Sequence, residues 1–225
     1  MSKRTQQNLV QGNILPTLIS FAVPVLLALF LQAMYGAADL IIVGQFAGTN
    51  EQSGVASGSQ LFNMITMVMT GLTMGVTVFV GEAIGSGKRR QAGQGVGCGI
   101  AVFAVVALLV TAAVVPFSDR LAVWMHAPAQ AFAQTSHYVR ICGIGTVFIT
   151  AYNVIGAVFR GIVDSKTPLV TVAIPCVINI LGDLLLVAVF HMGAAGAAIA
   201  TVSAQAVSVV CSLLLIRRKK LPFDF

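Results

Sequence analysis

Charged residues are scarce in this sequence. Lys, Arg, Asp and Glu together make up 9% of the 225 residues, whereas 57% are hydrophobic. A soluble domain carries roughly 25% charged residues, and a water-exposed surface cannot be built from so few. The composition therefore excludes an ordinary soluble fold and favours a membrane protein.

Several familiar signals are also missing. The strict alternation of apolar and polar residues that marks membrane strands does not occur, which excludes a closed barrel. The four cysteines show no CxxC spacing and lie in apolar segments, so no disulfide framework is indicated. The glycine-rich segment Gly85–Lys88 is not a nucleotide-binding loop, because that motif requires Gly at position 82 and Ser or Thr at 89, where this sequence has Glu82 and Arg89. An ATP-driven pump is therefore not indicated, and no cofactor is expected.

Six long apolar runs are present instead, each long enough to cross a bilayer, which takes about 20 helical residues. We predict an all-α integral membrane protein with a single six-helix domain over residues 1–225. The predicted helices run approximately over 18–43, 58–80, 95–115, 141–159, 168–190 and 193–216.

The thirteen basic residues indicate how this bundle is oriented. Eleven of them fall at the two termini and in the loops after the second and fourth helices, and only Arg120 and Arg140 fall on the other side. Cytoplasmic loops of membrane proteins carry the excess of Lys and Arg. Both termini are therefore predicted to be cytoplasmic, and the net charge of +6 is read as a topology signal and a contact for anionic lipid rather than for nucleic acid.

The longest loop on the outer side is expected to hold a short helix at the membrane surface. It runs from Pro116 to Arg140 and contains Leu121, Trp124 and Tyr138. Aromatic side chains favour the membrane–water interface. We predict a structural anchor here.

Two carboxylates, Asp39 and Asp183, lie well inside the predicted spans. Ionisable groups at membrane depth are costly and usually face a cavity or a partner. Gln32, Tyr35 and Asp39 share one helix face at spacings of three and seven, and Asn179 stands one turn before Asp183. Each acid is therefore predicted to have polar neighbours on its own helix.

Further polar residues on two other helices fall at comparable depths. Counting about 1.5 Å per residue places Asn153, Thr201 and Gln205 within reach of one cavity that opens outward. Carboxylate, amide and hydroxyl oxygens suit Na⁺, and carboxylates also bind protons. Pro175 either kinks its helix or frees a backbone carbonyl as a further ligand. The pattern predicts coupling to Na⁺ or H⁺.

Four segments together resemble one known family. They are "NLVQGNILPTLISFAVPVLLALFLQAMYGAADLIIVGQFAG" at Asn8–Gly48, "RGIVDSKTP" at Arg160–Pro168, "NILGD" at Asn179–Asp183 and "GAAGAAIATVSAQ" at Gly193–Gln205. The combination is similar to the opening half of the multidrug and toxic compound extrusion (MATE) family and covers essentially the whole chain.

The resemblance implies a multi-pass protein of the bacterial cell membrane that exports drugs or other small organic compounds in exchange for Na⁺ or H⁺. It also implies which residues bind the cation or proton. Helical spacing and depth, apart from the resemblance, make Gln32, Tyr35 and Gln205 candidates to line the cavity. The implied cation-binding residues are Asp39, Asn153, Asn179, Asp183 and Thr201, and a bound Na⁺ is expected at Asp39, Asn179 and Asp183.

One feature departs from the family pattern. MATE proteins have twelve helices in two similar lobes, whereas this sequence holds six. A second lobe is therefore expected as a partner, either as a missing carboxyl-terminal half or as a second copy in parallel orientation.

Three other functions were weighed against antiport. A flippase for lipid-linked oligosaccharides, from the same superfamily, would carry more basic residues in its cavity. An intramembrane aspartyl protease would need a GxGD motif, but residue 181 is Leu. A membrane scaffold or partner subunit without transport activity is the remaining alternative, and an enzyme is not expected.

Overall fold

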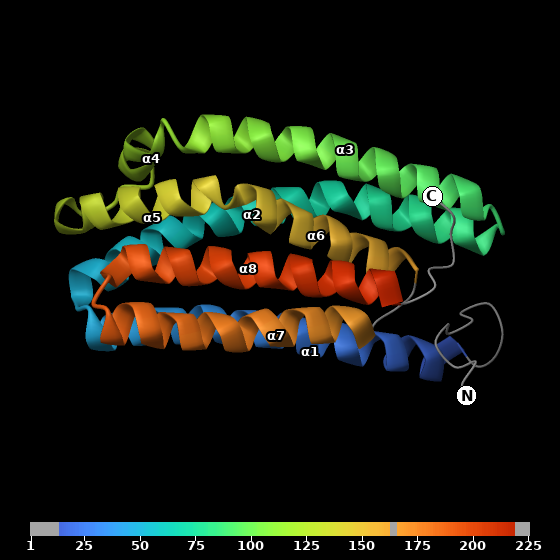
Figure 1. Ribbon diagram of the computed structural model, residues 1–225, viewed down its shortest axis with the longest axis horizontal. Helices are drawn as coiled ribbons and strands as arrows, with labels where there is room; N and C mark the ends of the chain where they lie inside the picture. Colours follow the sequence, from blue (N-terminus) through green and yellow to red (C-terminus); the bar gives the residue numbers. More distant parts are fainter. Residues whose placement is uncertain (1–13, 163–165, 219–225) are drawn as a thin grey trace.

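The protein is an elongated bundle of helices (Figure 1). The computed structural model describes residues 14–162 and 166–218, and this part of the chain contains no strand. The long helices are α1 (Ile14–Phe46), α2 (Thr49–Gly85), α3 (Arg89–Val114), α7 (Lys166–Asp183) and α8 (Gly193–Arg218). The shorter elements are α4 (Ser118–Trp124), the 3₁₀ turn η1 (Ala129–Ala131), α5 (Phe132–Ile144), α6 (Thr146–Gly161) and the π-helical segment η2 (Leu184–Val189).

Within the described residues, five helices are long and apolar enough to cross a membrane. The pair formed by Ala129–Ile144 and Thr146–Gly161 makes a sixth span if it is counted as one, although it bends by 56°. The chain is therefore an all-α, multi-pass integral membrane protein. The predicted cytoplasmic ends of the chain fall on residues 1–13 and 219–225, outside the described part.

The fourth span differs most from its predicted range of 141–159. The chain is already helical from residue 132, and the helix breaks near Gly145. A side chain on Gly145 would meet Val202 of α8 at 2.3 Å, so the close approach of α8 requires glycine at this position. The polar residues of α5, such as His137 and Arg140, had made this segment resemble a loop.

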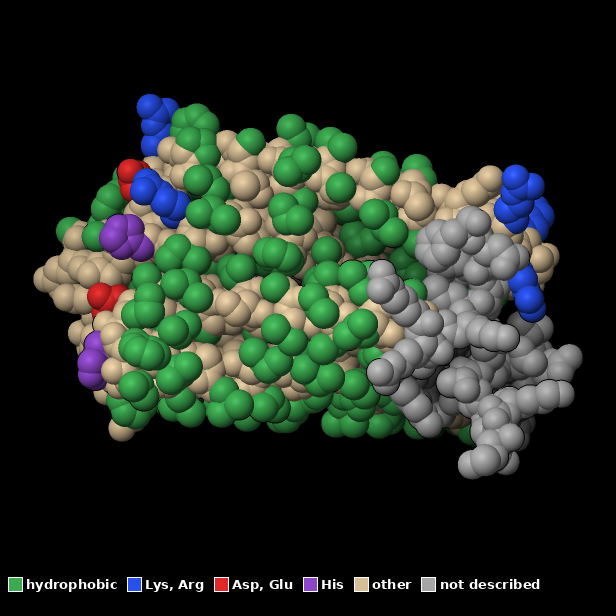
Figure 2. Space-filling model, in the orientation of Figure 1, with side chains coloured by type: hydrophobic (Ala, Val, Ile, Leu, Met, Phe, Trp, Pro, Cys, Tyr) green, Lys and Arg blue, Asp and Glu red, His purple; other side chains and the backbone are tan. Residues whose placement is uncertain are grey.

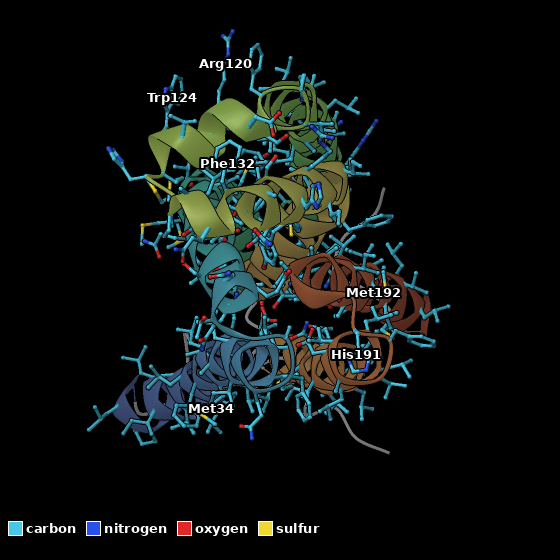
Figure 3. All side chains as sticks on the ribbon, turned by 90° about the vertical axis from the view of Figure 1, so that its left-hand side faces the viewer. Met34, Arg120, Trp124, Phe132, His191 and Met192 are labelled. Atoms are coloured by element: carbon cyan, nitrogen blue, oxygen red, sulfur yellow. The ribbon has the colours of Figure 1, made fainter. Side chains whose placement is uncertain are left out.

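The predicted outer anchor is also partly wrong. Trp124 is 74% exposed at the end of α4, as an interfacial residue should be, and Figure 3 shows it pointing away from the bundle. Tyr138 is instead only 3% exposed, because it lies on α5 and packs into the core beside Val55 and Val139.

The helices pack in two groups joined by α8. In one group, α1 packs against α7 and α7 against α8; in the other, α2 packs against α5 and α6, and α3 covers α2 and α6. The short turns between successive helices use glycines in the left-handed region, with φ of +91° at Gly48 and +76° at Gly87.

The surface has the polarity of a membrane protein. On the face shown in Figure 2, Lys and Arg side chains lie at both ends of the bundle, histidines and acidic side chains lie at one end, and hydrophobic side chains cover the length between them. Many large apolar residues are exposed, among them Leu26, Met67 and Leu109 at 62%, 78% and 64%. In a bilayer these side chains contact lipid.

Candidate functional site

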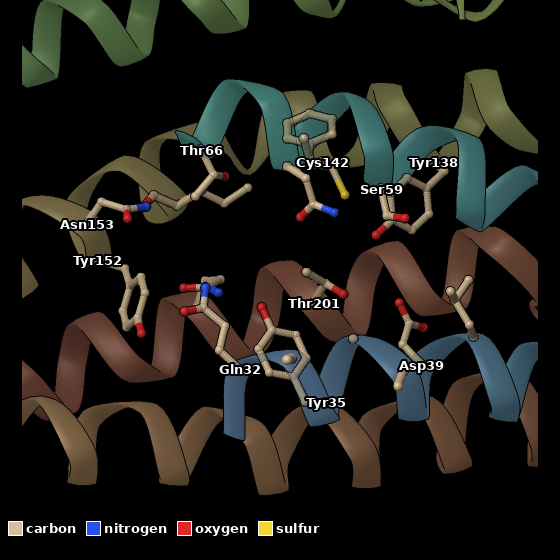
Figure 4. Close-up of a pocket in the computed structure, with 18 of the residues that line it drawn as sticks. Gln32, Tyr35, Asp39, Ser59, Thr66, Tyr138, Cys142, Tyr152, Asn153 and Thr201 are labelled. Atoms are coloured by element: carbon tan, nitrogen blue, oxygen red, sulfur yellow. The ribbon is translucent and has the colours of Figure 1, made fainter. Parts of the chain in front are cut away.

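A cavity of about 560 Å³ lies between the two groups of helices (Figure 4). Helices α1, α2, α5, α6 and α8 all contribute to its wall. Its polar lining residues are Gln32, Tyr35, Asp39, Ser59, Asn63, Thr66, Tyr138, Tyr152, Asn153, Thr201 and Gln205. No Lys or Arg is among them.

The polar stripe predicted on α1 faces this cavity. Gln32, Tyr35 and Asp39 all line it, as their helical spacing had indicated. Asp39 is 5% exposed, and its Oδ1 atom has no hydrogen-bond partner within the described residues. Residues Thr201 and Gln205 of α8 line the cavity as well, so the α1 and α8 candidates come together.

The two α7 candidates lie behind this wall. Asn179 donates from Nδ2 to the hydroxyl of Thr201 at 3.3 Å and lines a narrow crevice together with Tyr35, Thr201 and Gln205. Asp183 is 0% exposed and does not line the main cavity. The expectation that all candidates meet in one cavity therefore needs correction, because Asp183 is sealed within the helix packing.

Asp183 is unusual in its lack of partners. Neither of its carboxylate oxygens has a hydrogen-bond partner among the described residues. Asp39 is the acid that interacts with it electrostatically. A buried charge without a partner is strongly destabilising, so this carboxyl group needs a proton or a cation.

The backbone changes its helix type immediately after Asp183. Residues Leu184–Val189 form a π-helical segment, and the amide of Phe190 donates to the carbonyl of Leu185 at 3.0 Å. Short π segments inside α-helices frequently occur at functional sites. The segment places the sealed carboxylate at a point where the helix departs from regular geometry.

Asn153 lies in a different environment from the other candidates. Its Oδ1 accepts from the hydroxyl of Thr70 at 3.3 Å, and its Nδ2 donates to the carbonyl of Ile149 at 2.8 Å. Figure 4 shows it at the end of the cavity opposite Asp39. The structure therefore does not bring Asn153 together with the two acids.

The carbonyl that lacks a helical donor because of Pro175 is that of Thr171, and it accepts a hydrogen bond from α8. Proline has no N–H, so the carbonyl of Thr171, one turn earlier, loses its donor within the helix. The hydroxyl of Ser208 on α8 donates to that oxygen at 2.7 Å. This carbonyl thus joins α7 to α8.

Several cavity residues were not among the sequence candidates. Tyr138, Cys142 and Tyr152 line the cavity from the bent α5–α6 pair. On α2 the lining consists of Ser59, Asn63 and Thr66, which are spaced by four and seven residues. That spacing is a one-face helical pattern like the one on α1, and it could have identified them.

A resident metal centre finds no support in the side chains. Within residues 14–162 and 166–218, no group of three or more His, Cys, Asp or Glu residues could hold a metal ion. The candidate residues instead offer carboxylate, amide and hydroxyl oxygens, which are the donor types that suit Na⁺.

Comparison with known proteins identifies the family. The family model described as MatE matches residues 24–185, which is more than half of the chain. The chain belongs to the MatE family. The resemblance to this family that the sequence predicted is confirmed. MatE is a family of transporters rather than enzymes.

Relatives of known name agree with this assignment. The chain is 27% identical to the "Probable multidrug resistance protein YpnP" of Bacillus subtilis, over 95% of this chain and 48% of that protein. It is 26% identical to the "Probable multidrug resistance protein NorM" of Thermotoga maritima, over 82% of this chain and 40% of that protein. The chain thus spans about half the length of the curated relatives it matches. Together with its membrane-length helices, the family places it as a multi-pass protein in the bacterial cell membrane.

Solved structures share the fold. A MOP superfamily transporter from Pyrococcus furiosus matches 92% of this chain and 46% of its own, with a TM-score of 0.85 and 22% identity. A MATE protein in complex with MaL6 matches equally well in coverage and identity, with a TM-score of 0.84. These matches show that the MatE fold is shared.

Proposed function

We propose that this chain forms one lobe of a cation-coupled exporter of drugs or other small organic compounds. The curated relatives carry names of multidrug resistance proteins, and the chain spans about half their length. A second six-helix lobe is therefore the expected partner, supplied either by a further part of the same protein or by a second copy.

The observation that carries the coupling proposal is the state of Asp183. It is fully buried, both of its carboxylate oxygens are without partners in the described residues, and Asp39 is its electrostatic neighbour. Two carboxylates that interact in a low-dielectric interior repel each other unless a proton or cation lies between or on them. Binding of that ion is the event that we expect to couple to substrate release.

Neighbouring oxygens complete the proposed ion site. Asn179 has an unpartnered Oδ1 atom within the described part of the chain, and Thr201 supplies a hydroxyl oxygen beside it. The sequence also placed Asn153 among the cation-binding residues. We expect a smaller contribution from Asn153, because its amide oxygen and nitrogen already have partners.

The flippase alternative gains nothing from the main cavity. Its lining holds no Lys or Arg, whereas lipid-linked oligosaccharides carry phosphate groups that need cationic partners. An acidic and amide-rich wall suits organic cations and neutral compounds better. Export of such compounds is therefore the function that the cavity supports best.

Cation binding by the purified chain tests the proposal directly. Equilibrium binding of ²²Na⁺ and proton release or uptake on addition of Na⁺ would be measured for the wild type and for Asp183→Asn. Glu82→Gln is the matched control, since Glu82 is an exposed acid at the end of α2. We expect Asp183→Asn to lose the cation response, with Glu82→Gln unchanged.

The stability of the same variant provides the second readout. Removing an uncompensated buried charge should leave the protein as stable as before or more stable. Binding of ²²Na⁺ by the wild type would indicate Na⁺ coupling, and proton uptake on acidification without ²²Na⁺ binding would indicate H⁺ coupling. A response in Asp183→Asn equal to that of the wild type would refute the proposed role of Asp183.

A further inference from the structure

A second cavity, of about 130 Å³, lies deeper in the lobe. It adjoins the main cavity, because Gln32, Tyr152 and Asn153 line both. Its other walls come from Thr70 of α2, from Thr171 and Val172 of α7, and from the amino-terminal half of α1 and the carboxyl-terminal part of α6. The distribution of basic residues places these helix ends on the cytoplasmic side.

Arg160, in the last turn of α6, lines this cavity. Its Nη1 atom lies 3.2 Å from the position that a Cβ atom on Gly156 would occupy. Gly156 is one turn nearer to the membrane centre, so the guanidinium group is directed inward. Arginines near the ends of membrane helices usually extend toward water instead.

The guanidinium group has no carboxylate partner in the described part of the chain. The ion pair found there joins Arg140 to Asp119 at the outer end, far along the bundle from Arg160. Arg160 is partly buried, so its charge is not fully hydrated. A cationic group in this position attracts an anionic ligand.

The rest of the cavity suits an amphiphile. Tyr152 and Gln32 provide a hydroxyl and an amide that can donate hydrogen bonds to the same anion. Val25, Leu29 and Val172 form an apolar part of the wall. Figure 4 shows Tyr152 and Asn153 at the end of the main cavity away from Asp39. The second cavity therefore adjoins the main cavity at the end opposite Asp39.

We propose that Arg160, with Tyr152 and Gln32, forms a binding site for an oxyanion. The ligand is the carboxylate or phosphate of an amphiphile whose apolar part lies against Val25, Leu29 and Val172. The planar guanidinium fork fits such groups by paired hydrogen bonds. This site goes beyond the proposed antiport, because its occupation requires no cation at Asp183.

Binding of octyl phosphate and octanoate to the purified chain in a nonionic detergent tests the site. Dissociation constants would be measured by calorimetry, with octyl glucoside as the neutral ligand of equal chain length. We expect Arg160→Gln to weaken octyl phosphate binding by about tenfold or more, since hydrogen bonds to charged groups are the stronger class. Arg140→Gln is the matched control at an arginine outside the cavity and should bind as the wild type does.

Arg160→Lys keeps the test informative if the glutamine variant does not fold. This variant keeps the charge and loses the fork, so binding should weaken by about threefold. Binding of octyl phosphate that is equal in the wild type and both Arg160 variants would overturn the proposal. Failure of the wild type to prefer octyl phosphate over octyl glucoside would overturn it equally.

Native mass spectrometry distinguishes the two sources of the oxyanion. A phospholipid that copurifies with the wild type and is lost from Arg160→Gln would assign the site to a lipid phosphate. A wild type that carries no lipid but binds octyl phosphate through Arg160 would assign it to an anionic cargo. Both results support the site. Neither depends on cation binding at Asp183, so failure of this proposal and failure of antiport are separable.

Discussion

The two sides of the bundle around the main cavity differ in how their polar groups are satisfied. On the α2–α6 side, Asn153 bonds to Thr70 and to the backbone, and the hydroxyl of Thr77 donates to the carbonyl of Ala157 at 3.0 Å. On the α1–α7 side, oxygen atoms of Asp39 and Asp183 have no partner among the described residues. On the α2–α6 side these polar groups form hydrogen bonds that hold the helices together. On the α1–α7 side the two carboxylates keep oxygen atoms without partners in the described residues.

This difference separates structural from functional polar residues. Interhelical hydrogen bonds stabilise membrane bundles by modest amounts, whereas unpaired buried carboxylates cost stability and persist where an ion binds. Gln134 and Thr150, on α5 and α6, also hold unpartnered oxygens within the described residues, but both side chains are neutral and carry no charge that needs an ion. Three comparisons between matched variants test this distinction.

The largest effect is expected where α2 and α6 approach most closely. A Cβ atom on Gly161 would lie 2.8 Å from the carbonyl oxygen of Thr77 and 3.0 Å from the side chain of Val80. The oxygen belongs to a helix backbone and cannot move aside, so Gly161→Ala should destabilise the protein by about 1–3 kcal/mol. The measurement is the free energy of unfolding of the purified protein in a detergent titration.

Gly156→Ala is the control on the same helix. Its new methyl group would meet only the end of the Arg160 side chain, which is flexible. Stability should therefore hold or improve slightly, because alanine favours helix more than glycine does. Equal losses in the two variants would show that helix-wide effects, and not the contact with α2, decide the cost.

The second comparison exchanges the two asparagines. Asn153→Ala removes the acceptor of the Thr70 hydroxyl, so it should cost about 1–2 kcal/mol of stability and change cation affinity little. Asn179→Ala also removes an interhelical bond, the one to Thr201, so its cost in stability should be similar, but it should reduce cation affinity by about tenfold. Unfolding and ²²Na⁺ or proton binding would be measured for both. The assignment of the two sides fails if Asn153→Ala has the larger effect on cation affinity.

The sequence predicted the polar α1 stripe correctly because helical spacing alone decides which residues share a face. Gln32, Tyr35 and Asp39 needed no knowledge of neighbouring helices to be placed together. The same reasoning applies to Ser59 and Thr66 of α2, which line the opposite wall and were overlooked because hydroxyl residues are common in membrane helices.

Tertiary packing decided what the sequence could not show. Whether Asp183 opens into the cavity depends on how α7 and α8 rotate against each other, and its burial follows from that packing. The bend near Gly145 depends on the contact with Val202, which is 57 residues away along the chain. Arg160 was counted as a loop residue because its charge fitted the topology, yet its side chain turns inward.

The smallest and sharpest effect concerns the carbonyl that Pro175 leaves without a helical donor. Ser208 donates to this Thr171 oxygen, so Ser208→Ala should destabilise the protein by about 1 kcal/mol. In Pro175→Ala, the restored N–H can bond to the same oxygen within α7. Ser208→Ala should then cost less in that background, with a coupling of about 0.5 kcal/mol or more between the two sites.

A double-mutant cycle over Pro175 and Ser208 measures this coupling from four unfolding free energies. Additive costs would mean that the hydroxyl of Ser208 serves α7–α8 packing in general and not the freed carbonyl. Cation binding in the same four proteins gives a second readout. Because the carbonyl already has a donor from α8, we expect Ser208→Ala to leave cation affinity within about twofold of the wild type. A gain in cation affinity would instead show that the Thr171 carbonyl oxygen can serve as an ion ligand once Ser208 no longer donates to it. Pro175 would then have a functional role in ion binding and not only a structural one.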